Sequence, residues 1–319
     1  MKLVFRYVMT AVVLLSCVCV KAQDRMVAVL QHGDSTHVFY NSNAFVNALA
    51  AAESGDVITL SQGAFVPATI TKAVKIIGAS AAGSVVSKFS SSVTVNLESG
   101  ESGLHMEGVR MTSLTINGDT INDAVFKRCY CEGNWNINAQ SNNCIILQCR
   151  IEGHFYPDKL SNNLLVKNSI LSSSINSNTI GASLILENCN IQNMTSVKSG
   201  IVKNCVIRTA SSNSADILWH NTAYNSDYTN PSPNAFKLNM YPITTNDLSK
   251  YCGNAITDHL TDAGKEKLIG TDGTYIGAYG GATPYTTLPA IPRVTSVTVP
   301  SESYGNGKLP VTITVEVNN

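Results

Sequence analysis

One polar stretch in the middle of the chain carries several side chains that could take part in acid–base chemistry. They are Arg150, His154, Tyr156, Asp158 and Lys159. His154 or Tyr156 could serve as a general base, and Arg150 or Lys159 could stabilise a developing negative charge. The stretch is the longest excursion between predicted strands, where a functional loop could lie. The simpler alternative is an ordinary polar loop, because one His and one Asp are a weak signal, so the sequence identifies no firm catalytic set.

A second group of side chains suits binding instead of catalysis. Aromatic rings stack on sugars through their apolar faces, and Trp219 falls in a column of residues predicted to point outward. Three tyrosines follow it in the chain, namely Tyr224, Tyr228 and Tyr241. Together the four rings would form a carbohydrate platform toward the C-terminal end. The alternative is that they pack as local core under a loop.

Both groups lie in or beside a repeat that runs over residues 103–224. Seven similar segments each contain a polar corner, and the corners are 20 residues apart four times and then 16 apart twice. The corner residues are Gly108, Arg128, Gln148, Asn168, Asn188, Asn204 and His220. A fixed period of this size is typical of a solenoid.

The pattern within each segment predicts the type of solenoid. Leu184 and Leu186 alternate with polar neighbours, which indicates a strand with one buried face. After Asn188 the parity changes, so that Cys189 and Ile191 point inward, and asparagine tolerates the left-handed backbone of such a bend. A third, weaker strand is indicated by 114–116 and 135–137. Three strands per coil, stacked about 4.8 Å apart, predict a parallel β-helix.

The position just before each corner points outward and shows how the surface is charged. It holds Glu107, Lys127, Leu147, Lys167, Glu187, Lys203 and, in the predicted register, Trp219. Two acidic residues never follow one another on adjacent coils. The alternation of Lys167, Glu187 and Lys203 is typical of a solvated surface ladder. The net charge of +0 and the charged fraction of 14% show no footprint of a nucleic-acid binder.

Seven cysteines remain once Cys17 and Cys19 of the N-terminal segment are set aside. They are Cys129, Cys131, Cys144, Cys149, Cys189, Cys205 and Cys252. Four of them fall in one inward column, where cysteine behaves as a small apolar residue. Stacked core thiols are therefore expected, and a disulfide between neighbouring coils, such as Cys189 to Cys205, is the alternative. We expect neither a metal nor a cofactor, because no CxxC pair accompanies the column and histidine is scarce.

The N-terminus predicts export. Residues 1–22 combine Lys2 and Arg6 with a short apolar run and a small residue, Ala22, before the expected cleavage site, which is typical of a secretory signal. Periplasmic, cell-surface or extracellular locations are all compatible with it. The alternative is lipoprotein processing at Cys17, which would attach the protein to a membrane.

The remaining chain is predicted to form four parts. Residues 23–54 hold two short strands and a helix that plugs the solenoid, because an open end would expose core and edge strands. The parallel β-helix spans 55–224. A loop-rich closing segment follows over 225–282 and includes a short helix in TDHLTDAGKEKL. Residues 283–319 form a β-hairpin, for which Asn306-Gly307 is the turn signal.

Two segments resemble a known family. The run from 43 to 78, a helix followed by GDVITLSQGAF and KAVKIIGA, is similar to the opening of secreted pectin-lyase-like right-handed β-helix proteins that are common in gut and oral Bacteroidetes. Residues 268–281, LIGTDGTYIGAYGG, resemble the closing motif of many such proteins. The resemblance implies an all-β fold, a right-handed parallel β-helix with an N-terminal capping helix and a C-terminal β-hairpin. It says less about function, because this fold hosts several activities.

The fold resemblance raises polysaccharide lyases and glycoside hydrolases, so their motifs must be sought. The paired Asp and Gly-His-Gly of polygalacturonases are absent, with Gly153-His154-Phe155 the nearest approach. The Asp cluster and the Arg-x-Pro-x-x-Arg motif of pectate lyases are absent as well. We therefore expect an exported, non-catalytic protein that contacts polysaccharide or host or cell-surface material. The alternatives are a lyase or hydrolase with degenerate motifs and a purely structural surface protein.

Overall fold

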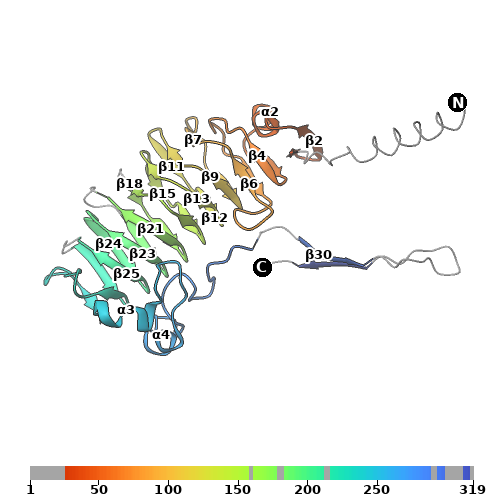
Figure 1. The fold of residues 1–319 in the computed structure, drawn as a ribbon. Helices are drawn as coiled ribbons and strands as arrows, with labels where there is room; N and C mark the ends of the chain where they lie inside the picture. The colour runs from red at the N-terminus through yellow and green to blue at the C-terminus, as the bar shows by residue number, and fades with distance from the viewer. Residues whose placement is uncertain are drawn as a thin grey trace, which may run out of the picture.

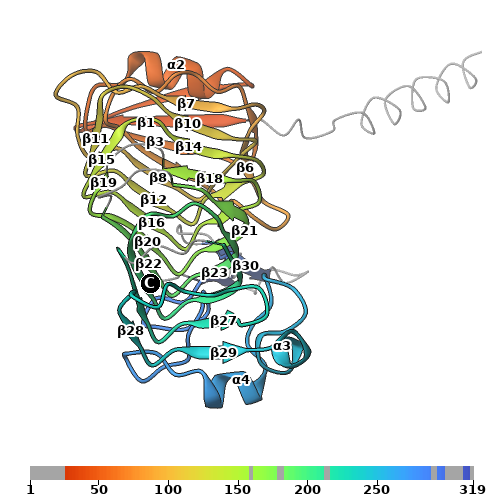
Figure 2. The same cartoon turned by 90° about the vertical axis from the view of Figure 1, so that its left-hand side faces the viewer.

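The computed structural model describes residues 26–157, 161–177, 183–211, 216–288, 293–298 and 312–316. Its body is a β-solenoid of about 9 turns with parallel sheets, drawn in Figure 1 as a ladder of short strands. The N-terminal signal and Cys17 lie outside the described residues. Figure 2 shows the rungs stacked one above another from the helix near the N-terminus to the two short helices near the other end.

The first sheet forms one face of the solenoid. Its order is β2 (Ser35–Tyr40), β1 (Val27–His32), β3 (Val57–Leu60), β5 (Lys75–Gly78), β8 (His105–Glu107), β12 (Val125–Lys127), β16 (Ile145–Leu147), β20 (Leu164–Lys167), β22 (Leu184–Glu187), β24 (Ser199–Lys203), β26 (Asp216–His220) and β28 (Lys237–Leu238). Strand β1 pairs antiparallel with β2 and β3, and every later pair in this sheet is parallel.

The second sheet forms the adjoining faces. Its main path is β29 (Tyr241–Ile243), β27 (Ala223–Asn225), β25 (Val206–Ala210), β23 (Asn190–Met194), β21 (Ile170–Ile175), β17 (Arg150–Ile151), β13 (Tyr130–Cys131), β9 (Val109–Met111), β6 (Ser87–Phe89) and β4 (Gly63–Phe65). Beside it run β7 (Val93–Val95), β10 (Leu114–Ile116), β14 (Trp135–Ile137) and β18 (Phe155–Pro157). A small third sheet holds β11 (Thr120–Asn122), β15 (Gln140–Asn142) and β19 (Ser161–Asn162).

Each regular turn therefore uses four short strands, one more than the sequence predicts. The turn that begins with β8 continues through β9, β10 and β11, and the next two turns repeat this order. From β20 onward the turns shorten. Strand β21 pairs with both β17 and β18, so one strand takes over the role of two.

The core is made of like residues stacked in register. One inward column holds Met106, Phe126, Ile146, Val166, Leu186, Val202 and Trp219, all buried. The inward positions predicted for the block around Asn188 are confirmed, since Leu184, Leu186, Cys189 and Ile191 are all buried. Burying such side chains stabilises the fold by about 1.5–3 kcal/mol each.

The predicted corners are confirmed up to Asn204, and the last one is wrong. Gly108, Arg128, Gln148, Asn168, Asn188 and Asn204 all have positive φ, but the final left-handed residue is Asn221 and not His220. The last step is thus 17 residues long, and its extra residue reverses the predicted parity. Trp219 consequently pairs with inward Val202, while His220 pairs with outward Lys203.

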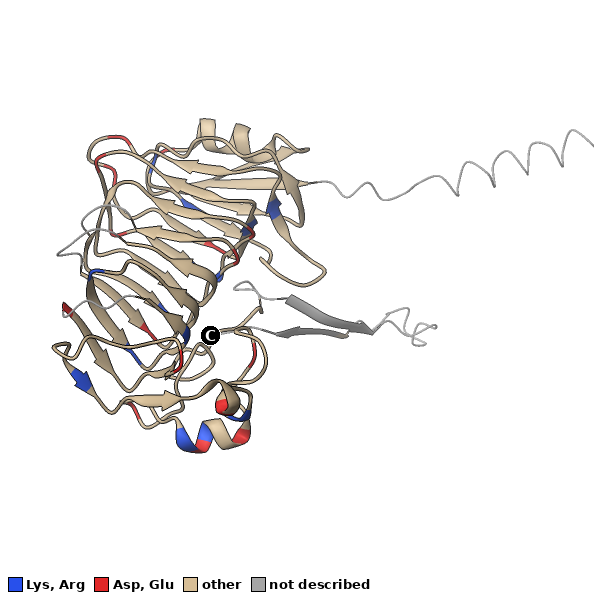
Figure 3. Ribbon diagram, turned by 60° about the vertical axis from the view of Figure 1, so that its left-hand side comes forward, with Lys and Arg blue, Asp and Glu red and all other residues tan. Residues whose placement is uncertain are grey.

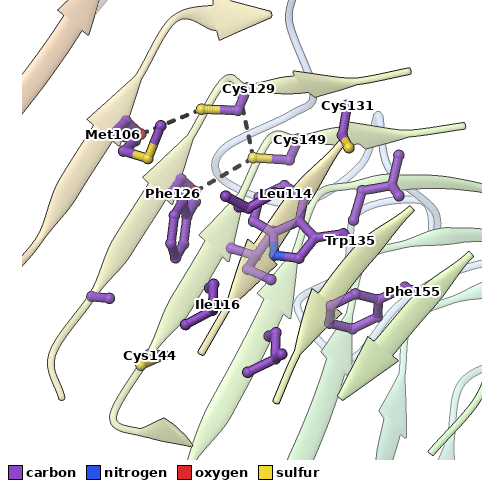
Figure 4. Close-up of a cluster of buried hydrophobic side chains, with 14 of the residues drawn as sticks. Met106, Leu114, Ile116, Phe126, Cys129, Cys131, Trp135, Cys144, Cys149 and Phe155 are labelled. Carbon is purple, nitrogen blue, oxygen red and sulfur yellow. Dashed lines mark hydrogen bonds between the residues drawn. The ribbon is translucent and has the colours of Figure 1, made fainter. Parts of the chain in front are cut away.

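The corrected register also explains the residues that follow each corner. They are Cys129, Cys149, Ser169, Cys189, Cys205 and Thr222, and each donates an S–H or O–H to the carbonyl two residues earlier. Figure 4 shows Cys129 and Cys149 stacked above the aromatic core, with Cys149 reaching the carbonyl of Phe126. All seven cysteines of the described residues are free and buried. Thiols serve here as small core groups that also satisfy a carbonyl.

The predicted N-terminal helix is present as α2 (Ala44–Ala51). Its apolar side is buried, and the Phe45 ring meets the Phe89 ring of β6 edge-on at 4.8 Å. Asn43 takes the N-cap position without a side-chain hydrogen bond, and Ala52 follows the helix in extended conformation. The helix therefore depends on its packing against the first turns for stability.

The closing segment is more ordered than a loop. Strands β28 and β29 continue both main sheets past Tyr224 by one rung. Two short helices follow, α3 (Thr245–Cys252) and α4 (Asp262–Lys267), and the second confirms the helix predicted in TDHLTDAGKEKL. The chain then turns back along the solenoid, as the blue ribbon of Figure 1 shows. We call residues 268–285 of this returning chain the strap.

The strap lies on the corner column and binds its amides one after another. Asn221 Nδ2 donates to Ile269 O, and Asn204 pairs with both the backbone N–H and the hydroxyl of Thr271. Asn168 Nδ2 donates to Ala278 O and Gly280 O, and Gln148 Nε2 donates to Pro284 O at 2.6 Å. Gly277 is required where the strap crosses Asn190, because a Cβ there would lie 2.6 Å from Asn190 Oδ1.

After the strap, β30 (Arg293–Thr298) and β31 (Thr312–Glu316) form an antiparallel pair. This agrees with the predicted C-terminal hairpin, whose turn at Asn306-Gly307 lies outside the described residues.

Candidate functional site

The clearest gathering of functional side chains is on the outer surface of the second sheet. Lys88, Arg110, Tyr130 and Arg150 occupy successive rungs in one outward column. Glu132 and Glu152 stand beside them, two residues after Tyr130 and Arg150. We call these six residues the outer ladder. Their charges are among those that Figure 3 shows on the solenoid surface.

The members of the outer ladder hold one another in place. The guanidinium carbon of Arg110 lies 4.6 Å from the centre of the Tyr130 ring, and that of Arg150 lies 5.5 Å from the same ring. Glu132 accepts from Lys88 Nζ at 3.0 Å and from Arg110 at 2.7 Å. Arg150 pairs with Glu152, whose Oε1 also accepts from the Tyr130 hydroxyl at 3.3 Å. Cations over a ring face attract it, so these contacts fix the orientation of Tyr130.

These contacts set the charge states. Burial raises the pKa of Glu132, but hydrogen bonds from Lys88 and Arg110 outweigh it, so the pKa of Glu132 lies below its ordinary value. Burial raises the pKa of Tyr130, and the negative charge of Glu152 raises it further. Tyr130 is thus a neutral phenol that donates a hydrogen bond, which suits binding better than proton abstraction.

The strap brings further aromatic rings to the same region. Tyr279 stacks on His259 with ring centres 3.5 Å apart, and Tyr285 meets Tyr279 edge-on at 5.7 Å. Burial raises the pKa of both tyrosines, while the positive charge of Arg150 lowers it by a smaller amount. Arg150 is therefore felt by rings on the strap as well as by Tyr130.

The structure separates the residues proposed for catalysis. Arg150 belongs to the outer ladder. His154 and Tyr156 form a different pair, with ring centres 5.5 Å apart, and His154 Nδ1 lies 3.3 Å from the Ser173 hydroxyl. Asp158 and Lys159 lie outside the described residues. Among the described contacts of His154, none is with a cation that could stabilise charge beside it.

The predicted aromatic platform is wrong in its central member. Trp219 is fully buried and is one of the largest core side chains, for the reason given by the longer last step. Tyr224 packs against the solenoid core at the end of an inward column, and Tyr241 packs on the other side of the second sheet and donates to Ile269 O. Tyr228 is 65% exposed. The four rings do not share one surface.

Sequence reasoning missed the outer ladder because it examined only the position before each corner. The ladder occupies the second and fourth positions after the corner, where Arg110, Tyr130 and Arg150 recur at the same 20-residue spacing. Sorting these outward positions by rung would have found it. The ion pairs predicted for Lys167, Glu187 and Lys203 are confirmed, with Nζ–Oε1 distances of 3.1 and 3.9 Å.

Two wider surveys complete the description of the site. Within the described ranges, no group of three or more His, Cys, Asp or Glu residues is placed to hold a metal ion. In the same part of the chain, no helix is both long and apolar enough to cross a membrane.

The fold and the outer ladder define the class of this protein as a parallel β-solenoid with an ion-paired, aromatic outer face. No family model, curated protein or solved structure matches the chain. Its function must therefore be inferred from its own residues.

Proposed function

We propose that this is an exported right-handed parallel β-helix protein of the pectin-lyase-like type, which contacts polysaccharide without cleaving it. The signal-like N-terminus supports export to the periplasm, the cell surface or the medium, and α2 serves as the N-terminal cap. The residues that carry the family resemblance support the handedness and the type. Polysaccharide or other glycan-bearing surface material is the partner.

The outer ladder is the observation that carries the binding function. A solenoid repeats its surface at each rung, about 4.8 Å apart, so a linear polymer laid along it meets several rungs at once. Tyr130 offers a ring held between Arg110 and Arg150, and the flanking carboxylates and cations offer hydrogen bonds to hydroxyl groups. Rigid aromatic and arginine side chains are the residues that most often dominate binding energies.

The test compares binding and cleavage on one panel of uronic-acid and neutral polysaccharides. Retention of the purified protein on the polymers is measured beside the release of unsaturated products and reducing ends. We expect retention without product. Tyr130→Ala should weaken retention by about three- to tenfold, the value of a lost aromatic contact.

The matched control is Tyr40→Ala, which removes a tyrosine that is 54% exposed on β2. It should bind as the unmodified protein does. Product formation would replace this proposal with a lyase or hydrolase. A protein that neither binds nor cleaves any polymer would instead be a structural surface protein.

A further inference from the structure

The corner column contains one residue whose chemistry its surroundings do not satisfy. Arg128 occupies the rung next to Gln148, where the column makes its last hydrogen bond to the strap. It has φ of 52°, a conformation in which arginine is uncommon, and it is only 7% exposed. A long cation in a left-handed, buried corner position is costly, so its presence calls for a role.

The Arg128 guanidinium is only partly paired. Its Nε donates to Gln148 Oε1 at 3.2 Å and lies 3.7 Å from Glu107 Oε1. Its Nη1 is buried and has no hydrogen-bond partner among the described residues. Buried donors are normally satisfied, and one on a charged group is the most costly to leave unmade.

A cavity of about 380 Å³ lies beside this group, between the corner column and the strap. It is lined by Lys127, Arg128, Leu147, Gln148 and residues 282–286. Its volume is at the lower end of the range for small-molecule sites. Its far wall is the strap, whose backbone Gln148 holds in place, so the cavity is built into the fold.

The charges around the cavity favour an anion with one negative charge. Glu107, itself 7% exposed, faces both Lys127 at 3.2 Å and Arg128. One carboxylate therefore serves two permanent cations, and His105 Nε2 also lies 3.1 Å from it. One further carboxylate would balance the two cations, and guanidinium N–H groups match carboxylate oxygens in geometry.

We propose that this cavity binds the carboxylate of a small organic or sugar acid, with Arg128 Nη1 as its buried donor and Lys127 as its second cation. The site is separate from the outer ladder and does not depend on glycan binding there. The strap forms its outer wall, so the conserved order of contacts along the corner column ends at a ligand site instead of at solvent.

Calorimetric titration of the full chain tests the site with matched probes. Glucuronate and glucose differ only at the carbon that bears the carboxylate, acetate supplies the carboxylate without the sugar, and sulfate is a dianion of different shape. We expect glucuronate to bind, glucose not to bind, and sulfate to bind more weakly than the carboxylates. Acetate that binds as tightly as glucuronate identifies the source as a free acid, and weaker acetate identifies a sugar acid.

Arg128→Asn is the variant of choice, because asparagine occupies four later positions of the same column with positive φ. It should fold and should bind glucuronate about tenfold or more weakly, as expected when a charged hydrogen bond is lost. Lys127→Gln provides a second variant on the surface, with a smaller loss. Lys237→Asn removes an exposed cation from β28 and should bind as the unmodified chain does.

Full affinity in Arg128→Asn would overturn the proposal, as would the failure of every carboxylate to bind the unmodified protein. Equal binding of sulfate would overturn the carboxylate assignment. If Arg128→Asn did not fold, unchanged affinity in Lys127→Gln would be the contradicting result.

Discussion

The corner column is built in two ways on the two sides of Gln148. From Asn168 to Asn221 the corner residues are asparagines, and each makes at least one hydrogen bond through its side-chain amide, most of them with the strap. Nearer the N-terminus the column continues with Arg128, whose Nη1 has no partner among the described residues.

The difference teaches which side of the column serves stability. Asparagine tolerates a left-handed backbone and carries both a donor and an acceptor, so one residue type satisfies the corner and the strap together. Arginine tolerates neither the conformation nor the burial as well. The strapped side is therefore organised for stability, and the side at Arg128 keeps unsatisfied polar chemistry beside a cavity, as functional sites often do.

The largest effect should come from breaking the strapped side. Asn204→Leu places a bulky residue at φ of 54° and leaves the N–H and the hydroxyl of Thr271 without their partner. We expect a loss of about 3 kcal/mol or more in the free energy of unfolding, the sum of backbone strain and unsatisfied buried groups. Denaturant unfolding measures it.

Asn239→Leu is the matched control for that experiment. Asn239 has φ of 51° but is exposed and outside the strap network, so it reports the strain alone. Thiol labelling then localises the damage. Burial raises the pKa of Cys205 far above its ordinary value, and in Asn204→Leu the Cys189 and Cys205 pair should react before Cys129 and Cys149. Equal losses in both variants would mean that the amide network contributes nothing.

Much of this architecture could be predicted from local pattern alone. The 20-residue spacing, the alternation of apolar residues and the asparagines at the corners predict the solenoid, its inward columns and six of the seven corners. These signals are local because each rung repeats the same backbone geometry.

The errors arise where the local pattern is ambiguous or the contact is long-range. His220 and Asn221 are both polar, so a corner fits either, and the choice of His220 wrongly turned Trp219 outward. The hydroxyl or thiol at the following position would have decided it, since Thr222 continues that column and Asn221 does not. The strap joins residues more than 100 positions apart, as between Asn168 and Gly280, and such pairing leaves no periodic trace in the sequence.

A smaller effect of opposite sign is expected on the other side of the column. In the absence of ligand, Arg128→Asn removes an unpaired buried cation and introduces a residue that suits the backbone. We expect the free energy of unfolding to rise by about 1–2 kcal/mol. Lys237→Asn again serves as the control. A loss of stability in Arg128→Asn would show that the guanidinium supports the fold, and the contrast between the two sides would disappear.

The smallest effect concerns the dependence of stability on pH. Burial raises the pKa of Glu107, but the hydrogen bond from His105 and the charges of Lys127 and Arg128 together outweigh it, so the folded pKa lies below its ordinary value. A carboxyl whose pKa is lowered by folding stabilises the protein above its unfolded pKa of about 4.3 and loses this contribution as the pH falls through the folded pKa. Glu107→Gln should therefore be less stable at neutral pH by no more than about 1 kcal/mol, the scale of a partly exposed ion pair.

The two unfolding curves should converge as the pH falls below about 4, because protonated Glu107 then resembles the glutamine. Glu266→Gln, at an exposed position of α4, controls for the loss of a surface charge, and Glu132 is common to all the proteins and cancels. A difference that stays constant from neutral to acid pH would mean that the glutamine disturbs packing instead of charge. In that case the two cations at this corner do not depend on Glu107 for their balance, and the two sides of the column would differ in shape and hydrogen bonding but not in their response to protons.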